Sequence, residues 1–129
     1  MILYVSIAHV LQLHRRQLAL FGGSGGLRDR GGLETAVARP RMTFGGEDLY
    51  PDRAAKAAAL LHSLVMNHPF VDGNKPVGAM AAELFLRAND VRLTAGDREL
   101  TEMTLVAAQG RLDAEAIAIW FRQRTREEG

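Results

Sequence analysis

The sequence predicts an all-α fold, a compact bundle of about six helices. Apolar residues recur at the three- and four-residue spacing of a helix face in successive segments along most of the chain. Residues that cap helix N-termini precede several of these segments, and glycine, proline or asparagine follows them. A chain of 129 residues is expected to form one domain, residues 1–129, around one hydrophobic core.

The N-terminal region is predicted to hold one long helix. Residues 2–5 are a short β-prone stretch, Ser6 is a suitable N-cap, and Gly22-Gly23 would stop the helix. We interpret His14, on its apolar face, as a satisfied and partly buried histidine rather than a ligand. The predicted apolar face comprises Ile7, Val10, Leu11, His14, Leu18 and Phe21.

Two short elements follow. The glycine-rich residues 22–26 are interpreted as a flexible loop, because no Gly-Lys-Ser/Thr follows them and no clear strand precedes them. A short helix is predicted over Leu33 to Ala38, ending before Pro40. Residues 42–50 hold two glycines between short apolar pieces, which predicts a small hairpin or flap.

Two long central helices frame a loop. Asp52 can cap a helix that runs to about Asn67, where Pro69 forces the chain out of helix. This places His68 at the end of a buried helix, with its ring facing the loop. The second helix runs to about Ala88 and ends at Asn89-Asp90. The predicted inward residues are Ala57, Leu61, Leu64 and Val65, then Val77, Met80, Ala81, Leu84, Phe85 and Ala88.

Two further helices are predicted near the C-terminus. Asp97 would cap the first, which Gly110 closes, and Asp113 would cap the second. The charged residues 122–128 are interpreted as a solvated helix end. The predicted inward residues are Leu100, Met103, Ala107, Ile117, Trp120 and Phe121.

Composition excludes several classes of function. The formal net charge of +1 gives no electrostatic case for binding nucleic acid or an anionic membrane. The chain has no cysteine, so a disulfide framework and a thiolate metal site are excluded. We find no signal peptide and no apolar run of roughly 20 residues that could span a membrane. These features together fit a cytoplasmic protein.

The richest chemistry lies in residues 68–75, His-Pro-Phe-Val-Asp-Gly-Asn-Lys. They bring an imidazole, a carboxylate, a carboxamide and an ammonium together. Pro69 and Gly73 break any helix through the segment, so these groups can point into one small volume. By itself such a loop could be only a capped turn between helices.

This string resembles the motif of the Fic family, His-x-Phe-x-Asp/Glu-Gly-Asn-Gly/Lys-Arg. The lysine after the asparagine resembles the Doc (death-on-curing) branch of that family. Residues 26–29, 33–34, 38–40, 57–67 and 85–86 also resemble Doc-like chains. The resemblance implies the same helical bundle, with the motif loop between the two central helices and a flap that holds a target peptide by strand addition.

Each loop residue has a role suited to phosphoryl transfer, which needs positioned phosphates, neutralised charge and an oriented hydroxyl. His68 can accept the proton of an incoming hydroxyl, and Asp72 is a hard oxygen ligand for Mg²⁺. Gly73 lets the backbone approach an anion, while Asn74 can cap the next helix and contact phosphate. Lys75 adds a positive charge beside that helix end. Phe70 is expected to anchor the loop in the core.

The resemblance further implies a protein kinase that uses ATP and Mg²⁺. Its implied target is a threonine of translation elongation factor Tu, and its action stops translation. It also implies a cognate antitoxin, whose C-terminal segment would fold into a groove of the toxin.

Pro76 departs from the family, which has arginine there. Proline is tolerated in the first turn of a helix, so the fold should survive. A bidentate phosphate contact and a backbone amide are nevertheless lost. The enzyme is therefore expected to be weakened or inactive.

Two alternatives stay open. One is a Fic-type adenylyl transferase, and the other is a non-catalytic module that binds an antitoxin and acts as a co-repressor. A zinc site has little support, because His62 and His68 lie six residues apart and no third ligand is apparent.

Overall fold

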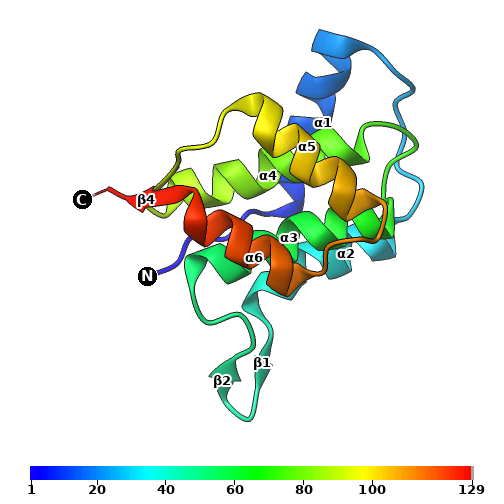
Figure 1. Ribbon diagram of the computed structural model, residues 1–129. Helices are drawn as coiled ribbons and strands as arrows, with labels where there is room; N and C mark the ends of the chain where they lie inside the picture. Colours follow the sequence, from blue (N-terminus) through cyan, green and yellow to red (C-terminus); the bar gives the residue numbers. More distant parts are fainter. Residues whose placement is uncertain (129) are drawn as a thin grey trace.

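The computed structural model describes residues 1–128, and within them it confirms the all-α prediction with six α-helices and two small sheets (Figure 1). The helices are α1 (Ile7–Phe21), α2 (Arg30–Ala38), α3 (Arg53–Asn67), α4 (Asn74–Ala88), α5 (Asp97–Ala108) and α6 (Ala114–Gln123). A short 3₁₀ turn, Arg39–Arg41, follows α2 directly. Along residues 1–128, no helix combines the length and the apolar character that a membrane crossing needs.

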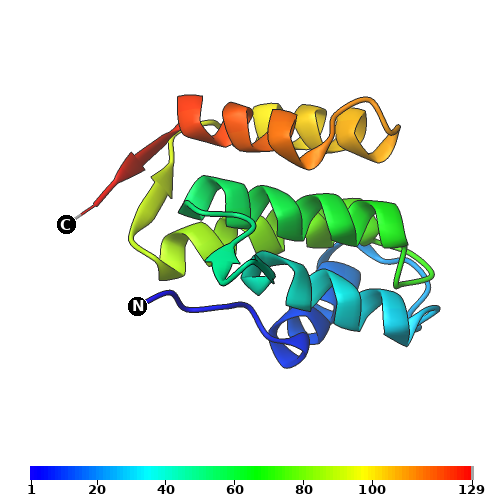
Figure 2. The same cartoon turned by 90° about the horizontal axis from the view of Figure 1, so that it is seen from below.

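The helices form three layers, with α3 and α4 in the middle (Figure 2). Helices α5 and α6 cover one side of this pair, and α1 and α2 cover the other. Helix α3 is alanine-rich and buried over most of its length, so its neighbours can approach it closely. A Cβ added at Gly78 of α4 would lie 2.9 Å from a methyl group of Val65 in α3. This close contact fixes the two helix ends that carry the motif loop.

Three of the five predicted N-caps are confirmed, and the one at Asn74 in the motif loop is wrong. The side chains of Ser6, Asp52 and Asp113 each accept a hydrogen bond from the amide three residues later. The prediction for Asp97 was also wrong, since Gly96 is the N-cap of α5 and Asp97 is its first helical residue. A carboxylate there still stabilises the positive end of the helix dipole.

The predicted inward faces are largely confirmed. In the central helices α3 and α4 most of the predicted inward residues are buried. Ala88 is an exception, because it is exposed in the last residue of α4. Trp120 is only partly buried, and Phe21, predicted on the apolar face of the first helix, is 76% exposed at the end of α1.

Both chain ends differ from prediction. Residues 2–5 form no strand, since Leu3 instead exchanges two hydrogen bonds of 2.8 Å with the side chain of Asn89. Residues 122–128 are not a solvated helix end. Helix α6 stops at Gln123, and β4 (Thr125–Glu127) pairs antiparallel with β3 (Val91–Leu93). This pairing gives the tail backbone hydrogen bonds that a frayed helix end would leave to water.

The predicted flap is present. Strands β1 (Thr43–Phe44) and β2 (Glu47–Asp48) form a hairpin that projects from the bundle (Figure 1). Its tip is Gly45-Gly46, and both glycines have the positive φ that tight hairpin turns require. The buried Lys56 of α3 holds the base of the hairpin, with its Nζ 3.1 Å from Asp48 Oδ2 and 2.7 Å from the Tyr50 carbonyl.

A second anchor of the flap contains a titratable group. The guanidinium of Arg39 donates to Tyr50 Oη at 2.7 Å and to Nδ1 of His62 at 2.8 Å. Burial and the charge of Arg39 lower the pKa of His62 below its usual 6.5, and Asp113 opposes this. Neutral His62 is therefore part of the folded arrangement, because only an unprotonated Nδ1 can accept from Arg39.

We expect acid to weaken this anchor. An unfolded chain binds a proton at His62 near pH 6.5, whereas the folded chain binds it only at lower pH. The contribution of neutral His62 to folding stability is thus complete above pH 6.5 and is lost as the pH falls through the lowered pKa of His62 in the folded chain. Melting temperatures followed from about pH 7.5 to about pH 5 should fall more for the wild type than for His62→Asn, which keeps an acceptor but does not titrate. Parallel curves for both chains would contradict this expectation.

Candidate functional site

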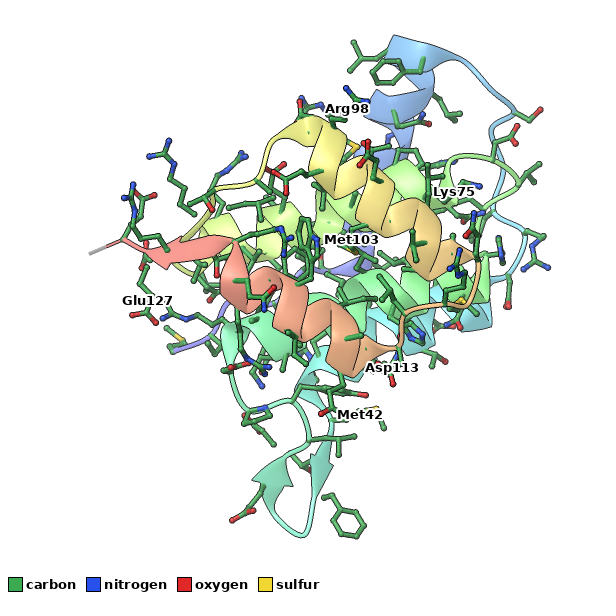
Figure 3. The ribbon with its side chains drawn as sticks, viewed as in Figure 1. Met42, Lys75, Arg98, Met103, Asp113 and Glu127 are labelled. Carbon is green, nitrogen blue, oxygen red and sulfur yellow. The ribbon has the colours of Figure 1, made fainter. Side chains whose placement is uncertain are left out.

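The predicted site residues lie in the loop between α3 and α4 and in the first turn of α4. Residues 68–73 connect the C-terminus of α3 to the N-terminus of α4, and residues 74–76 form the first turn of α4. Lys75 lies at the end of α4 that faces this loop (Figure 3). His68, Asp72 and Lys75 are exposed, so all three are accessible to a ligand.

His68 has an unusual backbone. It ends α3 in the left-handed region, at φ 47° and ψ 57°. This conformation costs a non-glycine residue roughly 1–2 kcal/mol, and a residue before proline ordinarily adopts an extended conformation instead. The Arg28 side chain donates from Nε to the His68 carbonyl at 2.8 Å and from Nη2 to the Asn67 carbonyl at 3.0 Å.

The glycine-rich stretch is more than the flexible loop expected from sequence, because it holds the motif loop. The Ser24 amide donates to Asp72 Oδ2 at 2.9 Å, and the Val71 amide donates to the Gly26 carbonyl at 3.1 Å. Next to these contacts, Leu27 forms an antiparallel bridge with Phe70. The stretch and the motif loop therefore behave as two short paired segments.

A residue of helix α1, His14, packs against the motif loop. Phe70 is only 2% exposed, which confirms its predicted anchoring role, and its ring stacks on His14 at 3.8 Å between centroids. His14 is 5% exposed, and its Nε2 lies 2.9 Å from the Asp72 carbonyl. The prediction of a satisfied, buried histidine is confirmed. Its partner lies 58 residues away, so no local pattern could have indicated it.

The side chain of Asn74 is bonded to the backbone of Phe70, within the same loop. Its Oδ1 accepts from the Phe70 amide and its Nδ2 donates to the Phe70 carbonyl, both at 2.9 Å. The capping role expected for it is wrong, since Gly73 is the N-cap of α4, at φ 86°, with no side-chain cap. Both polar groups of the Asn74 side chain are used within the loop. Its contact with phosphate stays a prediction.

The N-terminus of α4 offers an anion site. Within residues 1–128, the amides of Asn74 and Lys75 have no acceptor, and the first helical bond runs from the Val77 amide to the Gly73 carbonyl at 3.0 Å. Such amides and the helix dipole attract anions. Pro76 is the third residue of the helix, as predicted, and it supplies no amide to this site.

Asp72 suits a magnesium ion better than a zinc ion. Mg²⁺ usually takes one or two carboxylates and completes its shell with water and substrate phosphates. The Asp72 carboxylate is exposed and accepts one hydrogen bond, from the Ser24 amide. Across the part of the chain that the structure describes, no cluster of three histidine, aspartate or glutamate side chains could hold a metal unaided. This environment fits Mg²⁺ that shares its ligands between Asp72, water and substrate phosphates.

Gly73 is the most constrained residue of the loop. Besides its positive φ, a Cβ added there would lie 2.7 Å from Oε1 of the buried Gln17. We expect Gly73→Ala to lower stability by about 1–3 kcal/mol, from backbone strain and this contact together. Gly110→Ala is the matched control, because Gly110 has φ 78° and open space around it. Thermal melts of both variants should show the larger loss at Gly73, and equal losses would contradict the proposed contact with Gln17.

Comparison with known proteins agrees with the geometry. Residues 4–86, which include the whole motif, match the Fic/DOC family. A Mycolicibacterium smegmatis protein named Toxin Doc is 48% identical over 101 residues, which span 76% of this chain and 77% of that protein. A protein of Escherichia phage P1 named Protein kinase doc is 28% identical over 120 residues, which span 93% of this chain and 94% of that protein.

Proposed function

Because this chain belongs to the Fic/DOC family, we propose that it is a Doc-type toxin that acts as a protein kinase, transferring the γ-phosphate of ATP to a protein hydroxyl group. The observation that carries this proposal is the motif loop. It carries an exposed histidine and an exposed carboxylate, and it leads into the N-terminus of α4, where the amides of Asn74 and Lys75 have no acceptor within residues 1–128. Phosphoryl transfer requires this combination of proton acceptor, metal ligand and anion site.

The residues of the motif have separate roles in the proposed phosphoryl transfer. The amides of Asn74 and Lys75, with the Lys75 ammonium, hold the nucleotide phosphates. His68 accepts the proton of the attacking hydroxyl while the hydroxyl oxygen bonds to the γ-phosphorus. The bond between the γ-phosphorus and the bridging oxygen of the β-phosphate breaks at the same step, and ADP leaves. A magnesium ion, when bound, neutralises charge on the phosphates, and Asp72 is the residue that would hold it.

The protein substrate in this proposal is translation elongation factor Tu, modified on a threonine, with arrest of translation as the result. This follows the Doc branch that the motif resembles. The flap supports a protein substrate, because Phe44 on it is 82% exposed and the hairpin has free strand edges. Elongation factor Tu and ATP are found in the cytoplasm, so we place the reaction there.

Pro76 is expected to limit the reaction. It removes both an amide and the family arginine from the anion site, which leaves Lys75 as the cation next to the free amides. The fold itself accommodates proline, since α4 continues without interruption to Ala88. We therefore propose a kinase of reduced or absent activity.

The two alternative functions differ from a kinase in the part of ATP that they transfer to protein. An adenylyl transferase would attach the α-phosphate of ATP with its adenosine to protein, whereas a kinase attaches only the γ-phosphate. A module that only binds an antitoxin and acts as a co-repressor would transfer neither. Protein labelled from γ- but not from α-labelled ATP supports the kinase, and label from the α position would overturn it.

The antitoxin's C-terminal segment is expected to cover apolar side chains near the motif loop. Leu20 and Phe21, at the end of α1, are 67% and 76% exposed, and Val71 of the loop is also exposed. Phe21→Asp should weaken binding of a Doc-type antitoxin's C-terminal peptide at least about tenfold by calorimetry, because an interface aromatic commonly contributes that much. Leu105→Asp, at an exposed position of α5, should bind normally. Equal affinities for both variants would place the groove elsewhere.

A further inference from the structure

We propose that Arg28 is a positioning residue, which holds His68 in its left-handed conformation and so aims the imidazole at the attacking hydroxyl. The inference rests on the proposed function only in giving His68 the role of proton acceptor. The claim about the backbone of His68 stands without it.

The end of α3 needs an outside donor. A helix that ends in a left-handed residue is often closed by a Schellman motif, in which the amides of that residue and of the next residue donate back to the last turn. Here the next residue is Pro69, which has no amide hydrogen. Over residues 1–128, no backbone amide donates to the carbonyls of Asn67 or His68. Pro69 therefore cannot complete a Schellman motif, and backbone amides within residues 1–128 leave the carbonyls of Asn67 and His68 unpaired.

Arg28 supplies donors to these two carbonyls. Its planar guanidinium reaches both carbonyls at once, with Nε 2.8 Å from the His68 oxygen and Nη2 3.0 Å from the Asn67 oxygen. The backbone of Arg28 is itself fixed, because its amide and that of Asp29 both donate to the Pro69 carbonyl, at 2.7 and 3.0 Å. Carbonyls of three successive residues, 67 to 69, are thus held by one dipeptide.

Loss of the guanidinium should release His68. Without these donors, the residue is expected to relax toward the extended region that residues before proline prefer. Its Cβ would then point in another direction, and the ring would move with it. Arg28→Lys should restore little of the left-handed conformation of His68, because a single ammonium lacks the planar guanidinium geometry that bonds two carbonyls.

The test compares Arg28→Ala and Arg28→Lys with Arg30→Ala, which removes an exposed arginine that has no hydrogen bond or ion pair among residues 1–128. The first readout is independent of activity. The three-bond coupling between amide and Hα protons of His68, and its ¹³Cα shift, together distinguish the left-handed backbone from the extended one in solution. We expect the left-handed values in wild type and Arg30→Ala, and their loss in Arg28→Ala.

The second readout is kinetic and uses the Pro76→Arg background. There Arg28→Ala should lower kcat by about 10- to 100-fold, since a misplacement of about 1 Å can cost that much. KM for ATP should change little, and added guanidinium ion at low concentration should recover part of kcat. A merely structural arginine would not show this split between kcat and KM.

Each result decides the proposal. If His68 keeps its coupling and shift in Arg28→Ala, Arg28 does not hold the backbone and the proposal is wrong. If the backbone changes but kcat does not, Arg28 does not position a catalytic group. If Pro76→Arg shows no transfer at all, the proposed function fails, and the magnetic resonance data alone decide whether Arg28 holds His68.

Discussion

The Pro76→Arg variant is expected to transfer phosphate at least about 10²–10³ times faster than the natural chain. A single well-placed donor of this kind is worth about 3–4 kcal/mol to a transition state. An arginine at the third position of α4 would sit beside the free amides of Asn74 and Lys75 and could meet a phosphate with two hydrogen bonds. The substitution also returns a backbone amide to the same helix end. Rates of phosphate transfer by both proteins give the measurement.

This gain should come without a change of fold. Proline fits the first helical turn, and replacing it costs at most about 1 kcal/mol through the unfolded chain, so the melting temperature should fall by only a few degrees. Expression without antitoxin from a tightly controlled promoter provides the cellular control. The natural chain should be tolerated and the arginine form should arrest growth. Strong and equal toxicity would show that the phosphates are held by some other group.

The second large effect is expected at His68. In the Pro76→Arg background, His68→Asn should lower the rate by about 10²-fold or more, the usual contribution of a general base. Asparagine is suitable because it tolerates the left-handed region better than most residues but cannot take up the proton. Single-turnover rates with saturating ATP isolate the chemical step from nucleotide binding.

The appropriate control for this variant is His9→Asn. His9 is exposed on α1, and its hydrogen bonds within residues 1–128 that involve the side chain all go to Ser6 in the capping box, so its loss should leave the rate unchanged. Helical circular dichroism should be the same for both variants. Full activity in His68→Asn would remove His68 from the mechanism.

Local patterns predicted the helices because the information lies in neighbouring residues. Ser6, Asp52 and Asp113 lie just before apolar periodicity, and each is an N-cap in the structure. The loop at Pro69 and Gly73 was predictable for the same reason, since both residues interrupt helix within a few positions.

The support around the motif loop could not be predicted in this way. Arg28 lies 40 residues before His68, and His14 lies 58 residues before Asp72, so no periodicity connects either pair. The pairing of Val91–Leu93 with Thr125–Glu127 was missed for a similar reason. Strands of three residues are too short to alternate visibly, and only tertiary contact decides that they pair.

The most direct test of the account is identification of the transferred group on elongation factor Tu. The natural chain, Pro76→Arg and the double variant with His68→Asn are each incubated with purified elongation factor Tu, Mg²⁺ and ATP labelled at either the α or the γ position. Mass spectrometry then locates the product. We predict phosphothreonine labelled only from the γ position, strong with Pro76→Arg and weak or absent with the other two. Label from the α position, or no label with Pro76→Arg, would contradict the assignment of a protein kinase.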